Sequence, residues 1–214
     1  MKKPLISVCV PTHEMEDREF FLKRLLESLW NQTFQDFEIV VTDNSEDDTV
    51  KGICEWYKTG IKYYRNPRKG MAQNTNAGMG LASGDYIKLL YMDDFLLHEE
   101  VLEKALKKMT GEWMIMGASN NSSPYWTDDI HFGNNKLGSP SALMVKNQDP
   151  LFFDETLTWL LDCDLYKRYY DKFGEPVIVH GKHIGIGEGL HQATNYISDE
   201  RKLSEHHYLV QKHA

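Results

Sequence analysis

The stretch LLYMDDFLL, residues 89–97, places two adjacent carboxylates, Asp93 and Asp94, between two blocks of large apolar side chains. Such blocks are typical of a strand in a protein interior, where an ionised carboxylate without a partner is strongly disfavoured. The pair is therefore expected to be exposed at a strand end, hydrogen-bonded or bound to a cation. A polar turn that closes a buried strand is the alternative, because Asp is frequent in turns.

Outward from this stretch, the first half of the chain alternates strand-like runs with helical patterns, as βαβ units around a mainly parallel sheet do. The run 86–94 is largely apolar, as a strand covered on both faces should be. We therefore predict an α/β fold with a mainly parallel central sheet. Strands are expected at 5–11, 37–43, 61–66 and 86–94, and helices at 21–32, about 46–58, 70–83 and 97–109.

The second half is less regular. Residues 121–140 are rich in Asn, Ser, Gly and Pro and predict an ordered loop or a short hairpin. Neither a repeat nor a low-complexity tract divides the chain, so we expect one domain over residues 1–214. Further strands are expected at 112–120, 141–146 and 175–181, and helices at 158–174 and about 198–212, the latter capped by Ser198 and Arg201.

Composition limits the class of protein. The chain has 214 residues, of which 41% are hydrophobic, enough for a globular domain with a real core. Its formal net charge of -8 disfavours a protein that mainly binds nucleic acid. Cys9, Cys54 and Cys163 lack metal-ligand spacing and are expected to be small apolar fillers in a reducing compartment.

The N-terminal apolar run is too short for a signal peptide, and nowhere do about 18 apolar residues follow one another. We therefore expect a soluble cytoplasmic protein with no integral membrane segment.

Polar side chains follow three of the expected strands: PTHE after the first, TDNSEDDT after the second and MDD after the fourth. Ligands of open parallel α/β sheets bind outside the carboxyl ends of the strands. Thr12, Asp43 and the Asp93–Asp94 pair should therefore lie along one rim, suited to a ligand with a hydrogen-bonding base and charged phosphates.

A hard divalent cation is the natural partner of these carboxylates, since Mg²⁺ and Mn²⁺ prefer oxygen ligands and bridge to substrate phosphates. Because adjacent residues on a strand point to opposite faces, Asp93 and Asp94 are expected to divide the work. One would reach a nucleotide ribose and the other a metal ion.

Four segments together resemble the family 2 glycosyltransferases of the GT-A fold, closely over about residues 5–109 and more loosely to about 173. They are ISVCVPTH, SLWNQTFQDFEIVVTDNSEDDT, NTNAGMGLASGDYIKLLYMDD and WLLDCDLYKR. The resemblance implies a Rossmann-like, three-layer α/β/α fold. It also implies a nucleotide-sugar-binding half at about 1–110 and an acceptor-binding half with the C-terminal helix at about 111–214.

Carried over by position, the resemblance implies that Pro11 and Thr12 line the nucleotide site and that Asp43 accepts a hydrogen bond from the base, usually uracil. Asp93 would contact the ribose and Asp94 would bind Mn²⁺ or Mg²⁺. Here the motif reads Met-Asp-Asp, which lacks the first aspartate of a full Asp-x-Asp.

The segment LDCD matches the place of the family's general base. Inversion at an anomeric carbon requires one carboxylate that takes the proton of the acceptor hydroxyl. Asp162 is the first candidate, although Leu161 replaces the usual Glu before it, and Asp164 is the second. The alternative is that both simply occupy the first turn of a helix, where carboxylates are favourable.

The segment 185–195 resembles a region where family members place a metal-binding or phosphate-binding His near a Gln-x-Thr pattern. His191 is the candidate metal ligand, displaced to the position before Gln192. His180 and His183 are rivals, and a lone His is more often on the surface or hydrogen-bonded in a core.

Two further groups of side chains leave alternatives open. Arg65, Arg68 and Lys69 could neutralise a diphosphate or simply be solvated. Aromatic residues at 30, 56, 57, 63 and 64 are expected in the core, whereas Tyr125 and Trp126 lie in a polar loop where they could stack on an acceptor sugar.

The sequence thus predicts a metal-dependent inverting glycosyltransferase that moves a sugar from a nucleotide-diphosphate donor, with a UDP-sugar expected first, to a hydroxyl of a glycan or other acceptor. One alternative is a non-catalytic GT-A-like domain that binds a sugar nucleotide or glycan. The other is a nucleotidyltransferase, against which the acidic PTHEMEDRE after the first strand counts, because that class needs a Gly-rich, basic phosphate loop there.

Overall fold

The computed structural model of the chain describes residues 3–57, 60–189, 195 and 197–214. The strands are β1 (Ile6–Thr12), β2 (Phe37–Asp43), β3 (Ile61–Arg65), β4 (Tyr86–Leu89), β5 (Phe95–Leu96), β6 (Trp113–Ala118), β7 (Leu143–Lys146) and β8 (Val177–Gly185). The helices are α1 (Arg18–Trp30), α2 (Thr49–Tyr57), α3 (Met71–Leu81), α4 (Val101–Lys108), α5 (Leu161–Phe173) and α7 (Asp199–Lys212). Short 3₁₀ turns are η1 (Ile130–Phe132) and η2 (Pro140–Ala142).

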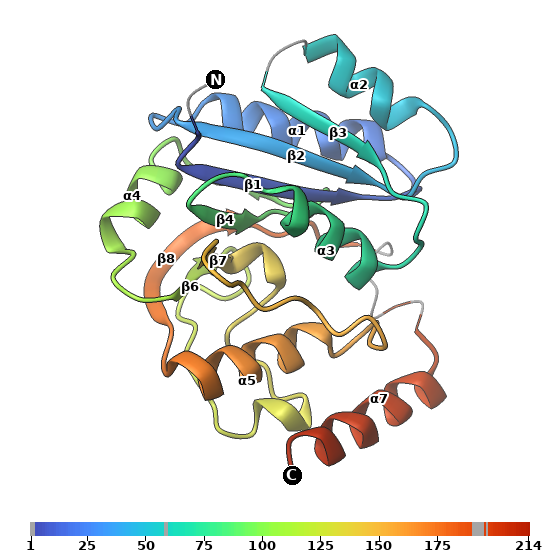
Figure 1. The fold of residues 1–214 in the computed structure, drawn as a ribbon, viewed down its shortest axis with the longest axis vertical. Coiled ribbons are helices and arrows are strands. Elements are labelled where there is room, and N and C mark those ends of the chain that lie inside the picture. Colours follow the sequence, from blue (N-terminus) through green and yellow to red (C-terminus); the bar gives the residue numbers. More distant parts are fainter. Residues whose placement is uncertain (1–2, 58–59, 190–194, 196) are drawn as a thin grey trace.

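One sheet collects the strands of the described residues in the order β3-β2-β1-β4-β7-β6-β8-β5 (Figure 1). The neighbours from β3 to β4 pair in parallel, and so do β6 and β8. β7 runs antiparallel to both β4 and β6, and β5 runs antiparallel to β8. The sheet is mostly parallel, which confirms the predicted α/β class, and it takes strands from both halves of the chain.

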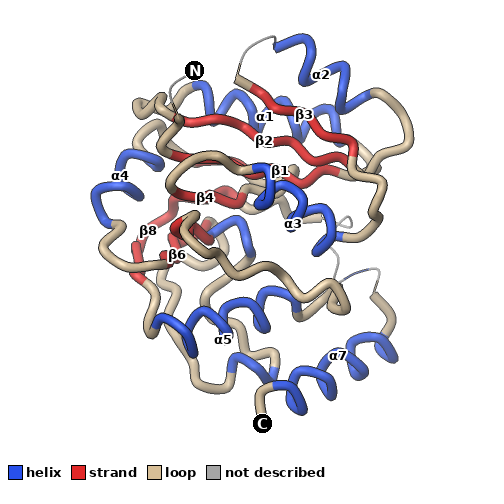
Figure 2. Tube along the Cα trace, viewed as in Figure 1, coloured by secondary structure: helices blue, strands red, loops and turns tan. Residues whose placement is uncertain are grey.

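Helices cover both faces of the sheet, so the fold has three layers (Figures 1 and 2). On one face the apolar sides of α1, α2 and α4 pack against alternate residues of β1, β2 and β6. On the other face α3, α5 and η1 pack against the intervening residues, and Leu209 of α7 joins them. A parallel strand between two helical layers must be apolar on both sides, which explains the continuous apolar runs of the sequence. Cys9, Cys54 and Cys163 are free and buried within these cores.

Several predicted elements end elsewhere than the sequence pattern indicated. The strand expected over 86–94 leaves the sheet after Leu89, and the chain turns before β5. The helix expected over 97–109 begins only at Val101, and the strand expected over 141–146 opens as a 3₁₀ turn. In each case the chain changes direction to reach a new neighbour in the sheet, which an apolar pattern alone does not reveal.

The C-terminal helix begins as predicted. The Ser198 hydroxyl accepts the backbone N–H of Arg201, at 3.2 Å between nitrogen and oxygen. The expected loop at 121–140 is irregular apart from η1 and Pro140, the first residue of η2. No helix among the described residues is long and apolar enough to cross a membrane.

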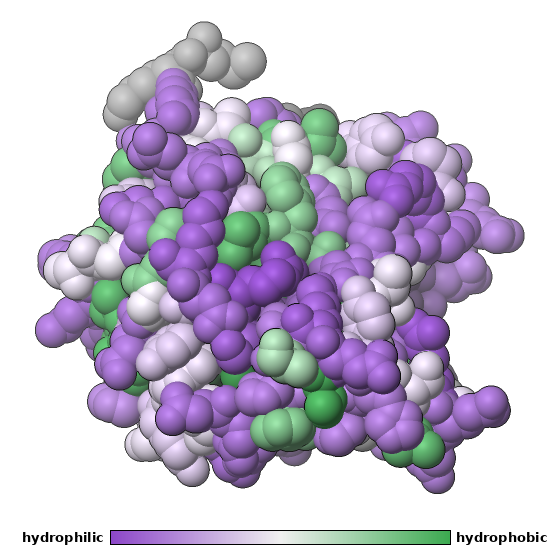
Figure 3. Space-filling view, turned by 60° about the horizontal axis from the view of Figure 1, so that its bottom comes forward, coloured by the Kyte–Doolittle hydropathy of each residue, from purple (hydrophilic) through white to green (hydrophobic). Residues whose placement is uncertain are grey.

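Two of the aromatic residues expected in the core lie on the surface. Trp56 is 72% exposed and Tyr64 is 42% exposed. Trp56 fails the expectation because α2 turns it outward, where its ring makes a T-shaped contact with Tyr57. Trp30, Tyr57 and the ring of Tyr63 are partly buried. The face shown in Figure 3 is mainly hydrophilic, with hydrophobic side chains in small separate areas.

Two tryptophans test this arrangement. Trp113 is 1% exposed and packs on Tyr166 and Tyr169, so Trp113→Ala should lower the free energy of unfolding by about 3–5 kcal/mol. Trp56→Ala removes an exposed side chain and should change it by less than about 0.5 kcal/mol. Urea unfolding followed by circular dichroism measures both. Equal losses of unfolding free energy in the two variants would contradict the placement of Trp113 in the core against α5.

Candidate functional site

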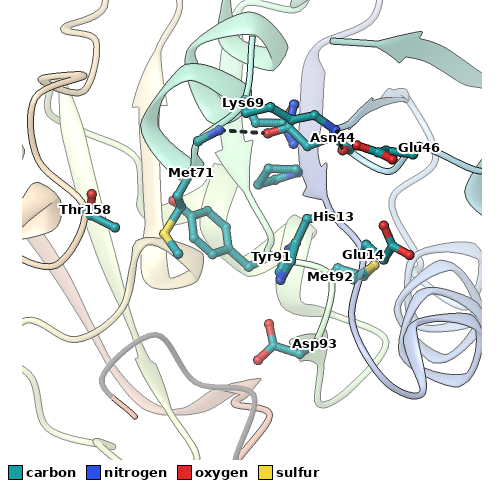
Figure 4. Close-up of a pocket in the computed structure, with 13 residues that line it drawn as sticks. His13, Glu14, Asn44, Glu46, Lys69, Met71, Tyr91, Met92, Asp93 and Thr158 are labelled. Atoms are coloured by element: carbon teal, nitrogen blue, oxygen red, sulfur yellow. Dashed lines mark hydrogen bonds and ion pairs between the residues drawn. The ribbon is translucent and has the colours of Figure 1, made fainter. Parts of the chain in front are cut away.

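A cavity of about 540 Å³ lies at the carboxyl ends of β1, β2 and β4 (Figure 4). This is the rim at which the sequence predicted a ligand site. Side chains that follow each strand gather around it, with His13, Tyr91 and Asp93 facing the same space. The lining residues are Pro11, His13, Glu14, Asn44, Glu46, Lys69, Gly70, Met71, Asn74, Tyr91, Met92, Asp93 and Thr158.

Thr12 and Asp43 lie behind the cavity wall and not on it. They are register partners in β1 and β2, and both are fully buried. Asp43 accepts hydrogen bonds from the Thr12 hydroxyl at 3.1 Å, the Ser45 amide at 2.9 Å and the Tyr63 hydroxyl at 2.8 Å. Burial raises the pKa of Tyr63 to about 12, so its hydroxyl keeps the proton that it donates. Asp43 thus fixes the strand ends from which the lining residues project.

The Asp93–Asp94 pair lies in a turn between β4 and β5, closed by the Asp94 amide and the Tyr91 carbonyl at 2.9 Å. We had expected strand alternation to point the two carboxylates in opposite directions, but the pair does not lie in a strand. The turn itself separates them. Asp93 lines the cavity, whereas Asp94 is 4% exposed and lies behind the turn.

Donors from two other segments hold the Asp94 carboxylate. The backbone N–H of Gly187 donates to Oδ1 at 2.9 Å, and the Ser141 hydroxyl also bonds to the carboxylate. Burial, and then the charge of Asp93, raise the pKa of Asp94 well above its usual range. The two carboxylates of LLYMDDFLL therefore have different environments. Asp93 is open to a ligand, and Asp94 is buried with hydrogen-bond partners.

A close approach of backbone to backbone makes this arrangement possible. A Cβ at Gly187 would lie 2.4 Å from the carbonyl oxygen of Asp93. The Arg24 guanidinium also donates to this carbonyl, at 2.5 Å, and lies 4.3 Å from the ring centre of Phe95. The turn is thus held from α1 and from the segment after β8.

The loop before α3 forms the side of the cavity next to β2. The Asn44 side chain donates to the carbonyls of Asn66 and Arg68, each at 3.0 Å, and accepts from the Gly70 amide at 3.2 Å. Gly70 has a φ of 123°, which favours glycine. Asn44 was not singled out from the sequence, because its role depends on partners more than twenty residues away.

Of the three basic residues considered for a diphosphate, Lys69 alone lines this cavity. Its ammonium group donates to the Asn44 carbonyl at 2.5 Å, as Figure 4 shows. Arg65 pairs with Asp48 at 2.8 Å, and Arg68 pairs with Glu155. Lys69 is therefore the cation of this group that can meet a bound anion.

A second cavity of about 270 Å³ adjoins the first, since Met71 and Thr158 line both. Asp162, in the first turn of α5, lines it. Its carboxylate accepts from the Asn135 side chain and from the Cys163 amide, each at 2.8 Å. Burial raises the pKa of Asp162 above its usual value. A partly desolvated carboxylate at this place can accept a proton.

Asp164 has a different environment. It is fully buried and paired with Arg168 and Lys212, each at 2.8 Å, and its Oδ1 lies 2.9 Å from Nε2 of His213. These contacts join α5 to the end of α7. They give Asp164 a structural role and leave Asp162 as the carboxylate of LDCD that reaches a cavity.

Glu205 of α7 positions the segment that leads into α5. Its carboxylate accepts the backbone N–H groups of Thr158 and Trp159 at 2.8 Å and of Leu160 at 3.0 Å. It is 2% exposed and paired with Arg201 at 2.7 Å. Local sequence patterns do not reveal these three bonds, because they link residues more than forty positions apart.

The histidine candidates separate clearly. His191, with Gln192, lies outside the described residues. His183 is 3% exposed, and its ring nitrogen lies 2.9 Å from that of His98. His180 is exposed on β8. His13 lines the cavity; its position in PTHE, directly after the first strand, was the signal that could have identified it.

The carboxylate oxygens on the cavity wall are suitable ligands for a hard cation. Among the described residues no group of three or more His, Cys, Asp or Glu side chains forms a cage for a metal ion. Mg²⁺ and Mn²⁺ at phosphate sites need no such cage, because one or two carboxylates and the substrate phosphates suffice. The Asp93 carboxylate on the cavity wall meets that requirement.

Trp126 packs within the protein and does not offer an open surface on which a sugar could stack. The Trp126 ring stacks on Tyr170, with ring centres 3.9 Å apart and planes 2° apart. Tyr125 is 56% exposed. The expected stacking surface for an acceptor is therefore reduced to Tyr125.

A mostly parallel α/β sheet has a cavity at its strand ends, the place where open α/β sheets bind ligands, and a second cavity with a carboxylate beside it. Residues 7–169 match the family described as Glycosyl transferase family 2, and the chain belongs to this family. The three-layer fold is that of the GT-A glycosyltransferases.

Known relatives agree with this assignment. Over 99 residues the chain is 39% identical to GalNAc(5)-diNAcBac-PP-undecaprenol beta-1,3-glucosyltransferase of Campylobacter jejuni, covering 44% of this chain and 31% of that protein. Over 108 residues it is 31% identical to chondroitin synthase of Pasteurella multocida, covering 49% of this chain and 11% of that protein. The matched segment spans less than half of either relative.

Two solved structures have the same fold. TarS 1-349 of S. aureus in complex with UDP-GlcNAc superimposes with a TM-score of 0.76 at 19% identity, over 97% of this chain and 66% of that one. The mannosyltransferase PcManGT of Pyrobaculum calidifontis, in complex with GDP-Man and Mn²⁺, gives 0.70 at 14% identity, over 99% and 65%.

The close approach at Gly187 predicts a sharp response to one methyl group. Gly187→Ala should lower the free energy of unfolding by about 1–3 kcal/mol, because the new Cβ meets the backbone of Asp93. Gly80→Ala, in α3, meets nothing within 4 Å and should leave stability unchanged or raise it by up to about 1 kcal/mol. Urea unfolding compares the two. A tolerated Ala at 187 would contradict the packing of this segment on the turn.

The two carboxylates of LDCD should differ in their effect on stability. Asp164→Asn leaves Arg168, Lys212 and His213 without their buried counter-charge and should cost about 3–5 kcal/mol. Asp162→Asn removes a charge that burial already disfavours, so its free energy of unfolding at neutral pH should stay within about 1 kcal/mol of wild type. Thermal unfolding at pH 7 ranks the two, and the reverse order would contradict their assigned environments.

Proposed function

We propose that the chain is an inverting glycosyltransferase that moves a sugar from a nucleoside-diphosphate donor to a hydroxyl group of a glycan or other acceptor. The observation that carries the proposal is the contact between two cavities: the one at the strand ends, with Asp93, and the one with Asp162, which share Met71 and Thr158. Donor and acceptor bound in these cavities would meet along that shared wall.

In the proposed donor site, Pro11 and Asn44 lie where a base and ribose would enter, and Asp43 shapes this region from behind by fixing Ser45. Lys69 offers a positive charge to the diphosphate. UDP is the first donor nucleotide to test, and GDP the second, because the two structural neighbours bind UDP-GlcNAc and GDP-Man respectively.

Asp93 is the carboxylate that we propose for a divalent cation, Mn²⁺ or Mg²⁺. Asp94 was expected in that role, but its carboxylate is buried and already bonded to Gly187 and Ser141. When bound, the cation would offset the negative charge that develops on the leaving diphosphate. Asp94 then contributes by holding the turn that presents Asp93. The ribose contact first expected of Asp93 is replaced by this role.

Asp162 is the proposed general base. It accepts the proton of the acceptor hydroxyl while that oxygen forms a bond to the anomeric carbon. The bond from this carbon to the diphosphate oxygen breaks, and the diphosphate leaves with the bonding electrons. Attack opposite the leaving group inverts the anomeric carbon. The raised pKa of Asp162 suits this task, since a base works best with a pKa near the operating pH.

A binding screen tests the donor site first. UDP, GDP, CDP and dTDP are each added with Mn²⁺, Mg²⁺ or EDTA, and stability is followed by thermal shift and affinity by calorimetry. One nucleotide should stabilise the protein only with metal, by about 2.7 kcal/mol at a hundredfold excess over its Kd. Asp93→Asn should lose this effect. Metal-dependent binding lost in Asp94→Asn but kept in Asp93→Asn would reverse the two assignments.

Asp162→Asn separates binding from transfer. It should bind the nucleotide and metal as wild type does, yet hydrolyse or transfer the sugar about 10²- to 10⁴-fold more slowly. Wild type that binds the nucleotide but shows neither transfer nor slow hydrolysis would instead favour the non-catalytic binding domain. Release of pyrophosphate from a nucleoside triphosphate would favour a nucleotidyltransferase.

A further inference from the structure

Lys88 is a lysine that the proposed mechanism does not use, and its burial requires an explanation. It lies on β4 and is 0% exposed. Among the described residues no carboxylate forms an ion pair with it. Burial lowers its pKa to about 7, against the opposing effect of the Asp94 charge. An apolar side chain at this place would avoid the cost of burying an ammonium group.

The ammonium group instead binds main-chain oxygens. It donates to the carbonyls of Leu89 at 2.9 Å, Leu143 at 3.4 Å and Ser141. An ammonium group has three N–H donors, so these three acceptors match its full capacity. Two of the carbonyls, those of Ser141 and Leu143, belong to the junction of η2 and β7. Lys88 therefore anchors this junction to β4.

The anchored junction is linked to both proposed substrate cavities, to the first through the turn at Tyr91 and to the second directly. The Ser141 hydroxyl accepts the backbone N–H of Tyr91 at 2.8 Å and bonds to the Asp94 carboxylate, so it holds the turn that presents Asp93. Ser139 and Pro140, directly before it, line the cavity of Asp162. A shift of the junction would therefore move both the turn that presents Asp93 and the wall of the Asp162 cavity.

We propose that Lys88 is a positioning residue: by binding the carbonyls of Ser141 and Leu143 it fixes the junction that sets both the Asp93–Asp94 turn and the wall of the Asp162 cavity. The proposal rests on the proposed function, because it assigns Lys88 to the same site. Its physical basis is the convergence of three buried carbonyls on one cation. Removal of the cation would leave these acceptors unsatisfied and free the junction to shift.

The test is a double-mutant cycle of Lys88→Met, Ser141→Ala and the double variant. Calorimetry measures the affinity for UDP and for GDP, each with Mn²⁺, and kinetics give kcat and KM for the donor. Glu38→Gln is the matched control. Glu38 is also buried and hydrogen-bonded, to Ser7 and Ser83, but it lies at the amino end of β2, away from the cavities. Urea unfolding reports the stability of every variant.

Lys88→Met should weaken metal-dependent nucleotide binding by about 10- to 100-fold, the range typical of residues that orient a metal ligand. Ser141→Ala should weaken nucleotide binding similarly. The double variant should bind no more weakly than the more affected single variant, because Lys88 acts on the turn through Ser141. Glu38→Gln should lose stability without losing affinity.

Two results would overturn the proposal. One is a Lys88→Met variant that loses stability as Glu38→Gln does but keeps wild-type affinity, kcat and KM. The other is strict additivity of Lys88→Met and Ser141→Ala. If Lys88→Met does not fold, Lys88→Gln, which keeps two N–H donors, takes its place in the cycle. Absence of any nucleotide binding by wild type would instead refute the proposed function itself.

Discussion

The buried carboxylate of Asp94 ties together three parts of the chain that are distant in sequence. It lies in the turn after β4, and it bonds to the amide of Gly187 and the hydroxyl of Ser141. A buried carboxylate tolerates the loss of such partners poorly, so the turn, the segment after β8 and η2, directly before β7, must keep their relative positions. Asp93 is presented to the cavity as a result.

Buried carboxylates also link distant segments around the second cavity. Asp162 lies in the first turn of α5, whose approach is held by Glu205 and whose buried side is held by Asp164. α7 thus braces the cavity of Asp162 through Glu205 and through the pairing of Lys212 with Asp164. Together with the anchored junction near Ser141, these contacts make the relative position of the two cavities a property of the whole fold and not of one loop.

The sequence predicted the elements of the first half well, because parallel strands between helical layers leave continuous apolar runs and amphipathic helices. It also placed Thr12, Asp43 and the aspartates at one rim, since strand ends follow from strand positions. It could not predict that the chain turns at Tyr91, that Asp43 is sealed behind the wall, or that Glu205 and Ser141 hold the site. Each of these depends on partners 20 to 93 positions away, which local pattern does not encode.

In the proposed site the turn presents Asp93, and not Asp94, to a metal-bound diphosphate. The most direct measurement is a crystal structure of the protein soaked with UDP and Mn²⁺, with anomalous scattering used to locate manganese. We expect the anomalous peak to place a manganese ion against an Asp93 carboxylate oxygen and the diphosphate, with Asp94 still bonded to Gly187. Manganese held by Asp94, or a diphosphate bound away from the turn, would contradict it.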